Sequence, residues 1–348
     1  MQKKIKILHL LNTGQYSGAE NVVCQIIKMF EGSDIEMVYC SLDGQIRNAL
    51  EERKITYFPV RKLCRREIKR IVREFQPDII HAHDIRASIV ASGFSKKAVL
   101  ISHIHGNHED MRSLSLKSFL YKMMSNKFKR IIWVSNSSFN QYKYKDLVHS
   151  KSMVLKNIIN INDLYKRVSE DTKAYDYDVA FIGRLSYPKN PIRLIEVLKQ
   201  VVYKIPNARI AIVGNGDLAS KVKEKVCENG IIENIDFYGF VDNPYKLLRD
   251  SKVFVMTSIY EGTPMSALEA MALGVPIVST PTDGLVELVS QGKTGYLSDE
   301  NEVLADHICH LLTDEHKRAE MAKLSKERAI QINNIGNYKN QLVGVYDN

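Results

Sequence analysis

The chain of 348 residues is 45% hydrophobic, and this length and apolar content predict about two domains, each with its own core. Its five cysteines are scattered and never spaced as CxxC, which argues against a disulfide framework and a zinc site and favours a reducing cytoplasm. Since no apolar run reaches the roughly 18 residues of a membrane span, we expect any membrane contact to be peripheral.

The net charge of +9 is unevenly distributed along the chain. Residues 1–173 hold 30 Lys+Arg and 17 Asp+Glu, a net +13, whereas the remainder holds 19 and 23, a net −4. A basic half suggests an anionic partner, either a membrane surface or a nucleic acid. A solvated, lysine-rich surface accounts for the same charge without any partner.

Short β-branched apolar runs alternate with longer amphipathic segments, which predicts parallel sheets with crossover helices. The predicted strands are residues 5–10, 34–40, 77–83, 98–105 and 130–135, followed by 178–183, 208–214, 234–239, 253–258 and 275–280. The fold class is therefore α/β, with two Rossmann-like, doubly wound domains at 1–165 and 166–330. A last helix at 331–348 is expected to pack back on the first domain. The polar segment between Asn157 and Asp178 is expected to be the linker.

The first half offers two candidate groups at predicted strand ends, where ligands of such sheets bind. In SGAE, Gly18 permits a close approach of backbone to a ligand, and the helix from Glu20 begins there, although a plain strand-to-helix turn would use the same residues. His103 and His105 alternate onto one face of their strand, so spacing does not choose between them. A structural role is the alternative for both histidines.

Residues 113–130 combine apolar side chains with basic ones at helical spacing. The apolar ones are Leu114, Leu116, Phe119, Leu120, Met123, Met124 and Phe128, and the basic ones are Lys117, Lys122, Lys127, Lys129 and Arg130. The segment predicts either a basic amphipathic helix on anionic lipid or a core-facing helix with its lysines in water.

In the second half, FIGRLSYPKN places Arg184 and Lys189 between a strand that ends at Gly183 and a following helix. Two cations beside a helix N-terminus suit a diphosphate. IVGNGD repeats a glycine-rich strand end at Gly214 and Gly216. The alternative is a pair of ordinary turns with surface cations.

Residues 258–280, SIYEGTPMSALEAMALGVPIVST, place the carboxylate of Glu261 at a strand end before a tight loop and a helix. Backbone N–H groups of this loop and helix start can cap an anion. The N–H groups concerned are those around Thr263, Met265 and Ser266, while Gly262 and Pro264 shape the loop. Glu269, about two turns beyond Glu261, can accept hydrogen bonds from a vicinal diol such as ribose, and a solvated helix face is the alternative for it.

These motifs, in this order, resemble the retaining GT-B glycosyltransferases of family 4, in which Glu261 and Glu269 would form the EX7E motif. The resemblance covers nearly the whole chain: SGAE at 17–20, PDIIHAH at 77–83, HIHG at 103–106, WVSNSS at 133–138, GRLSYPKN at 183–190, VGNGD at 213–217, YGF at 238–240 and EAMALGVPIV at 269–278. It implies two Rossmann-like domains facing across a cleft, the first for the acceptor and the second for a nucleotide-sugar donor.

The resemblance also implies a role for each matching position. Arg184 and Lys189 would hold the donor diphosphate, Glu269 the ribose, and Glu261 the hydroxyls of the transferred sugar. His105, in preference to His103, would be the first-domain histidine that contacts the donor sugar. The further donor-binding positions are Gly18, Gly183, Gly214 and Gly216, the base-facing Gly239, Phe240 and Val241, and Gly262, Thr263, Pro264, Met265 and Ser266. Thr263 stands where the family commonly has a bulkier apolar residue.

The implied activity is retaining, metal-independent transfer of a sugar from a nucleotide diphosphate, with UDP preferred, to a hydroxyl of a glycan or lipid-linked acceptor. Bacterial capsule, exopolysaccharide or O-antigen synthesis is the implied setting, in the cytoplasm or at the inner face of the cell membrane. No cofactor and no metal are expected, because the acidic DYD at 176–178 precedes its strand instead of following it.

Two other functions compete with this one. A GT-B sugar-nucleotide epimerase would share the fold and the class of donor. A nucleic-acid-binding protein would explain the basic half, but aromatic residues are not interleaved with the basic run at 61–70 and no recognised binding motif occurs. We therefore expect a nucleotide sugar and an acceptor as partners, with an anionic membrane surface compatible and no nucleic acid.

Overall fold

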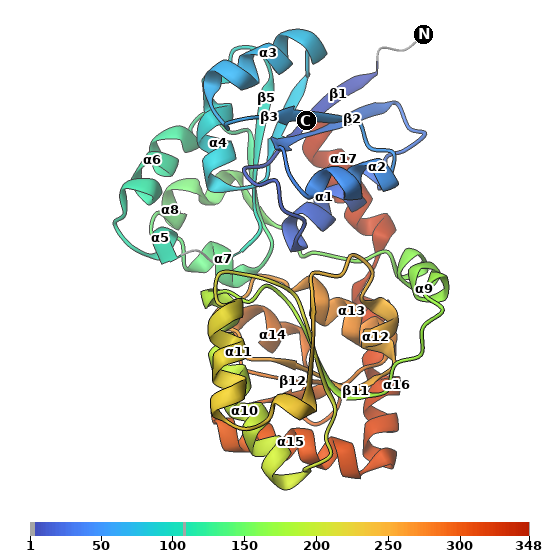
Figure 1. Cartoon of the computed structure of the whole chain (residues 1–348). Helices are drawn as coiled ribbons and strands as arrows, with labels where there is room; N and C mark the ends of the chain where they lie inside the picture. Colours follow the sequence, from blue (N-terminus) through green and yellow to red (C-terminus); the bar gives the residue numbers. More distant parts are fainter. Residues whose placement is uncertain (1–3, 107–108, 348) are drawn as a thin grey trace. The chain divides into compact units, whose positions relative to one another are not determined.

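The computed structural model describes residues 4–106 and 109–347, so the first three residues of the predicted first domain and Asn348 of the predicted last helix lie outside it. The chain forms two compact units: unit 1 runs to Asn157 and resumes at Gly336, and unit 2 is Ile158–Ile335. Each unit is built on one parallel sheet, as the sequence predicted (Figure 1).

Unit 1 contains a seven-stranded sheet of order β3-β2-β1-β4-β5-β6-β7. The strands are β1 Ile5–Leu10, β2 Ile35–Leu42, β3 Tyr57–Val60, β4 Ile79–Ala82, β5 Val99–Ile104, β6 Arg130–Trp133 and β7 Ser152–Val154. The helices are α1 Gly18–Met29, α2 Ile46–Glu52, α3 Arg65–Phe75, α4 Ile85–Ala91, α5 Glu109–Arg112, α6 Leu116–Ser125, α7 Asn136–Asn140, α8 Lys145–Val148 and α17 Ile335–Asp347, with short 3-10 turns η1 Ser92–Phe94 and η2 His149–Lys151.

Unit 2 contains a six-stranded sheet of order β10-β9-β8-β11-β12-β13. The strands are β8 Tyr177–Ile182, β9 Ile210–Val213, β10 Ile235–Gly239, β11 Ser251–Met256, β12 Ile277–Ser279 and β13 Gly295–Leu297. The helices are α9 Ile161–Glu170, α10 Pro191–Lys204, α11 Ala219–Glu228, α12 Tyr245–Arg249, α13 Met265–Leu273, α14 Asp283–Leu288, α15 Asn301–Thr313 and α16 Glu315–Ile332, with 3-10 turns η3 Tyr187–Lys189 and η4 Ile232–Asn234.

The sequence prediction missed β3, β7 and β13, and all three are sheet edges of three or four residues. An edge strand buries less apolar surface than a central one, so its sequence lacks the continuous apolar run that marked the others. Pro59 lies within β3 and is tolerated there because an edge strand can leave one N–H side unpaired.

Helix α10 illustrates how the helices attach to the sheets. Pro191 occupies its first turn, where a missing N–H costs nothing. Its buried face consists of Leu194, Ile195, Val197, Leu198 and Val201, all with no exposed surface. Each such side chain contributes about 1.5–3 kcal/mol by leaving water, so this face alone holds the helix on the sheet.

The segment that we expected to be an irregular linker contains helix α9, which packs in unit 2. Arg167 is buried and forms an ion pair with Asp242 at 2.7 Å, and the Tyr165 hydroxyl donates to the Ala272 carbonyl at 2.9 Å. The units therefore divide between Asn157 and Ile158, so α9 lies wholly in unit 2, whereas our boundary at 165/166 cut through it.

The C-terminal helix α17 belongs to unit 1, and Figure 1 shows it in red among the blue elements of that unit. Its buried residues include Leu342 and Tyr346, and the Tyr346 ring stands 5.8 Å from that of Phe30 after α1. Among the described residues, none of the helices combines the length and hydropathy that a membrane span requires.

Candidate functional site

Three strand-end loops of unit 2 are tied together by backbone hydrogen bonds. After β8, the N–H of Gly183 donates to Val213 at 3.0 Å, and after β9, the N–H of Gly214 donates to Gly239 at 2.7 Å. These bonds hold the loops after β8, β9 and β10 side by side at the carboxyl edge of the sheet. The predicted glycines Gly183, Gly214 and Gly239 thus meet at one place.

Two of these glycines are required by close backbone contact. Gly214 has φ +138°, and a Cβ on it would lie 1.9 Å from the Gly183 carbonyl oxygen. A Cβ on Gly216 would lie 2.2 Å from the Leu185 carbonyl oxygen. No side chain fits at either position, so the VGNGD motif is explained by loop packing whether or not a ligand binds.

The centre of the candidate site is an ion pair between Lys189 and Glu261, from the loops after β8 and β11. Lys189 Nζ lies 2.5 Å from Glu261 Oε1, and Ser258 Oγ donates to the same oxygen at 2.6 Å. The side chains are only 23% and 10% exposed. Because water screens such a pair poorly, each charge holds the other in position.

Arg184 differs from Lys189 in its surroundings. Its side chain is exposed, and the structure gives its guanidinium no hydrogen bond or ion pair with any residue in 4–106 or 109–347. The loop after β8 therefore carries one cation locked to a carboxylate and one that can turn toward an anion. Both follow the strand end that the sequence predicted.

The loop after Glu261 is tightly packed. Gly262, Thr263, Pro264 and Met265 are buried, and α13 begins at Met265. A Cβ on Gly284, at the start of α14, would lie 1.6 Å from the Gly262 carbonyl oxygen. The sequence prediction missed Gly284, although a glycine directly after a strand-end loop is a signal for such a contact.

Glu269 is buried in α13, which excludes the solvated helix face considered above. It is 8% exposed, and burial raises its pKa to about 7. The Tyr245 hydroxyl lies 3.4 Å from its Oε1, and Arg167 acts in the opposite direction to burial by favouring the ionised form. Sequence reasoning missed both of these neighbours of Glu269. Arg167 comes from the segment that was taken for a linker, and Tyr245 belongs to none of the motifs in the sequence.

The loop after β10 presents the residues expected to face a base. Gly239 has φ +65°, Phe240 is 47% exposed, and Val241 is half-buried. The next residue, Asp242, is the partner of the buried Arg167. An exposed aromatic ring on an anchored loop is suited to stacking against a planar group.

In unit 1, Gly18 is the first residue of α1 and is exposed, without a positive φ. Close backbone contact occurs instead at Gly14, where a Cβ would lie 2.5 Å from the Asp43 carbonyl oxygen. The Ser17 hydroxyl donates to the buried Glu20 at 2.5 Å. The SGAE motif therefore fixes the start of α1, and the conformation of Gly18 does not itself demand glycine.

The structure distinguishes the two candidate histidines. His103 is fully buried in β5, whereas His105 follows the strand and is only partly buried. Their rings stack at 4.1 Å between centroids, so both lie on one face, as alternation predicted. Of the two, only His105 has any exposed surface with which to meet a ligand.

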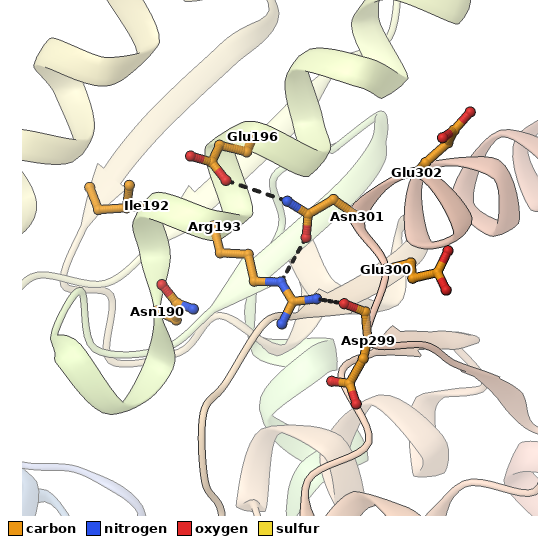
Figure 2. Close-up of a pocket in the computed structure, with 8 residues that line it drawn as sticks. All are labelled: Asn190, Ile192, Arg193, Glu196, Asp299, Glu300, Asn301 and Glu302. Carbon is orange, nitrogen blue, oxygen red and sulfur yellow. Dashed lines mark hydrogen bonds between the residues drawn. The ribbon is translucent and has the colours of Figure 1, made fainter.

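An open hollow beside this site, which begins at the residue after Lys189, has different chemistry. It has a volume of about 650 Å³ and is lined by Asn190, Ile192, Arg193, Glu196, Asp299, Glu300, Asn301 and Glu302. Figure 2 shows Arg193 bonded to Asn301 and to the Asp299 carbonyl, with the carboxylates around it. Its lining has more acidic than basic side chains and would therefore repel an anion. We do not assign the expected diphosphate to this hollow.

The acidic pair of DYD lies at the opposite end of β8 from Gly183. Asp176 Oδ2 is 3.3 Å from Arg209, and Asp178 Oδ1 is 2.8 Å from Lys252. Both carboxylates are therefore committed to ion pairs away from the strand-end loops.

Comparison with known proteins matches both units to sugar-transferring families. Residues 16–163 match the model described as Glycosyltransferase Family 4, and residues 166–328 the model described as Glycosyl transferases group 1. An uncharacterized glycosyltransferase of Methanocaldococcus jannaschii is 28% identical over 73% of this chain and 71% of its own. The Escherichia coli UDP-Gal:alpha-D-GlcNAc-diphosphoundecaprenol alpha-1,3-galactosyltransferase is 25% identical over 86% of this chain and 85% of its own. The crystal structure of Anabaena HepE in complex with UDP-glucose has a TM-score of 0.85 at 23% identity and covers 99% of both chains.

Proposed function

Because the chain belongs to the GT-B glycosyltransferases of family 4, with a group 1 second half, we propose that it is a retaining enzyme that uses a UDP-sugar. The acceptor would be a hydroxyl of a glycan or lipid-linked glycan in the synthesis of a cell-surface polysaccharide. The observation that carries the proposal is the Lys189–Glu261 pair, a cation and a carboxylate held together at the strand ends of unit 2. The choice of UDP is supported by the names of the relatives, which mention UDP-Gal and UDP-glucose.

The chemistry assigned to these residues is mainly electrostatic. Arg184 and Lys189 would neutralise the charge that develops on the leaving diphosphate while the acceptor hydroxyl attacks the anomeric carbon from the same face. Glu261 would accept hydrogen bonds from the sugar hydroxyls and keep Lys189 in place. Glu269 would accept the ribose hydroxyls. With two cations at the diphosphate, the reaction needs no metal in this scheme.

The first experiment identifies the donor. The protein is incubated with a panel of nucleotide sugars, with and without a lipid-linked glycan acceptor, and mass spectrometry follows each donor. We expect one UDP-sugar to be consumed, with UDP released and the sugar found on the acceptor. Conversion of a donor to its epimer without any acceptor would instead favour the epimerase.

The second experiment tests the diphosphate and sugar contacts. Arg184→Ala, Lys189→Ala and Glu261→Gln should each lower kcat/KM at least about tenfold, because each removes a charge or hydrogen bond worth roughly 1.5–3 kcal/mol. Lys199→Ala, on the exposed side of α10, is the matched control and should leave kcat/KM unchanged. Near-normal turnover in both cation variants would remove the diphosphate assignment.

We further propose that α6 docks unit 1 onto an anionic membrane, which would bring a lipid-linked acceptor to the enzyme. The buried side of α6 is Ser118, Tyr121 and Ser125. Four of its large apolar side chains point outward: Leu116 is 75% exposed, Phe119 45%, Leu120 38% and Met123 51%, with Leu114 beside them at 73%. Two other apolar residues of the predicted segment do not, since Met124 packs against the core and Phe128, after the helix, is buried. Lysines flank this apolar surface in a half of the chain with net charge +13.

This arrangement favours the lipid-facing helix over the core-facing one, since apolar chains in water gain by entering a bilayer interface. Each nearby Lys adds about 1 kcal/mol toward anionic lipid. The protein should sediment with vesicles of acidic phospholipid at low salt, leave them at about 0.5 M salt, and ignore neutral vesicles.

The test compares two variants that lose equal charge. Lys→Gln replacement at Lys117, Lys122, Lys127 and Lys129 should weaken sedimentation, whereas the same replacement in unit 2 at Lys199, Lys221, Lys223 and Lys225 should not. Donor affinity should be normal in the first variant. If wild type never binds acidic vesicles, or both variants behave alike, a soluble acceptor replaces the lipid-linked one.

A further inference from the structure

The hydroxyl of Ser258 shares one oxygen of Glu261 with Lys189. Ser258 comes two residues after the end of β11, is 2% exposed, and donates to Glu261 Oε1 at 2.6 Å. Lys189 Nζ lies 2.5 Å from the same oxygen. The sequence motifs gave roles to Lys189 and Glu261 and none to Ser258. The function proposed above does not use Ser258 either.

The backbone around Ser258 is held from two sides, so the fold fixes the place from which its hydroxyl donates. On one side, the hydroxyl of Thr257 donates to the Asn190 carbonyl at 3.1 Å. On the other side, the hydroxyl of Thr280, after β12, donates to the Ser258 carbonyl at 2.7 Å. Thr257 and Thr280 are buried as well, so water does not compete for these hydrogen bonds.

Two donors on one oxygen determine how the carboxylate of Glu261 is oriented. An ionised carboxylate only accepts hydrogen bonds, at either of its two oxygens. Since an ammonium and a hydroxyl from two different residues hold Oε1, the plane of the carboxylate cannot turn without breaking one of these bonds. Hydrogen bonds with a charged partner are roughly twice as strong as neutral ones. Glu261 is therefore held in one orientation.

The second oxygen of Glu261 is available to a ligand. Oε2 makes no hydrogen bond or ion pair with residues 4–106 or 109–347. It is not enclosed, because the side chain keeps 10% of its surface exposed and Oε2 is not among the buried polar atoms that lack a partner. An acceptor that is fixed in direction and reachable from solvent is suited to recognise a hydroxyl.

We propose that Ser258 is a positioning residue for sugar transfer: with Lys189 it occupies Oε1 of Glu261, so that Oε2 accepts a hydrogen bond from a hydroxyl of the transferred sugar. This role rests on the proposed function and deepens it. Ser258 acts through Glu261 and does not touch the sugar. The N–H of an acylated amino group on the sugar suits Oε2 as well as a hydroxyl does, whereas a carboxylate at the same place is repelled.

The same arrangement leaves Lys189 able to serve the diphosphate. An ammonium has three N–H donors. One of them is directed at Glu261, and the other two have no acceptor in residues 4–106 or 109–347. Lys189 can therefore contact a diphosphate oxygen without releasing Glu261. Because Ser258 also holds Oε1, the carboxylate keeps a bond to the protein if Lys189 moves.

Ser258→Ala removes the hydroxyl with the least change of shape. UDP carries the base, the ribose and the diphosphate but no transferred sugar, so its dissociation constant, measured by calorimetric titration, should be unchanged. For the UDP-sugar that the donor panel identifies, kcat/KM should fall about tenfold, as expected when one hydrogen bond to a charged group is lost. Ser251→Ala, at the start of β11, is the matched control. Ser251 is 6% exposed and donates to the Leu247 carbonyl at 2.7 Å, and its loss should change neither value.

A double-mutant cycle separates positioning from a general effect on the loop. If Ser258 acts only through Glu261, Ser258→Ala should lower kcat/KM about tenfold in wild type and less than about twofold when Glu261 is already alanine. UDP-sugars that each lack one hydroxyl then identify the partner of Oε2. The analogue with the largest loss in wild type should show a much smaller loss in Glu261→Ala and in Ser258→Ala.

Thr280→Val tests the same role from a second position. It keeps the shape of the side chain and removes the hydroxyl that holds the Ser258 carbonyl. It should lower kcat/KM for the UDP-sugar by less than Ser258→Ala does, with UDP binding unchanged. If Ser258→Ala does not fold, as circular dichroism would show, Thr280→Val carries the test.

The outcomes separate this role from the function. Normal kcat/KM in Ser258→Ala, or a tenfold loss that persists when Glu261 is alanine, would overturn the positioning role and leave the proposed function intact. An equal loss of UDP binding and of sugar transfer would reduce Ser258 to a structural residue of the loop. A wild-type protein that neither binds UDP nor consumes a UDP-sugar would reject the proposed function, and this role with it.

Discussion

Replacing Glu269 by glutamine should stabilise unit 2 in a way that depends on pH. Burial raises the pKa of this carboxyl from 4.5 to about 7 in the folded protein. Between those pH values the unfolded chain loses the proton of this carboxyl while the folded chain keeps it, so the free energy of unfolding falls as pH rises. Above about pH 7 the carboxyl is ionised in the folded protein as well, and the whole free-energy cost of burying the charge is present. Since each unit of pKa shift corresponds to 1.36 kcal/mol, the cost of burying this charge is about 3 kcal/mol.

Glu269→Gln removes this cost while keeping the size of the side chain. Relative to wild type, its free energy of unfolding should therefore be about 3 kcal/mol higher at pH 8 and nearly equal at pH 4.5. The same change should raise KM for the donor, because a carboxylate that accepts two ribose hydroxyls becomes an amide that accepts less well. Stability and donor binding would then change in opposite directions at one residue.

The assay has to report on unit 2. The single tryptophan, Trp133, lies in unit 1, so its fluorescence follows the wrong unit. Urea unfolding by circular dichroism, with hydrogen exchange of the α13 peptide, measures the right one. Glu224→Gln, an exposed glutamate on α11, is the control. A gain that is equal at pH 4.5 and pH 8, or a loss at both, would refute the reasoning.

Gly214→Ala should destabilise unit 2 by at least about 2 kcal/mol, because the new Cβ would lie 1.9 Å from the Gly183 oxygen at φ +138°. Gly292→Ala, at φ +70° with nothing within 4 Å, should cost only about 1 kcal/mol, and equal losses in urea unfolding would contradict the loop-packing account. Gly284→Ala should lower donor affinity as well as stability, measured by UDP titration, since it displaces the Gly262 carbonyl. Sugar transfer should survive EDTA, and a loss that Mg²⁺ or Mn²⁺ restores would show that a metal takes part.

Much of the fold could be predicted from the sequence because central parallel strands are buried on both faces. Their apolar runs, such as IKILHL and DVAFIG, are legible without any partner strand. The short edge strands β3, β7 and β13 carry no such run. Helix α9 was missed because its few apolar residues are outnumbered by polar ones, and its attachment depends on the ion pair of Arg167 with Asp242.

The candidate donor loops were also visible in the sequence, since glycines, cations and Glu261 follow predicted strands and strand ends of one sheet meet at one edge. Only the tertiary structure decided which groups touch. Lys189 and Glu261 are 72 residues apart in the sequence, and helix α10 separates the Gly183 loop from the Gly214 loop. Met37, His9, His83 and His105 lie in or directly after four different strands, and the contacts between them depend on register and burial. Sequence spacing gives the face on which a side chain lies, but the distance between side chains on different strands is fixed only when the sheet assembles.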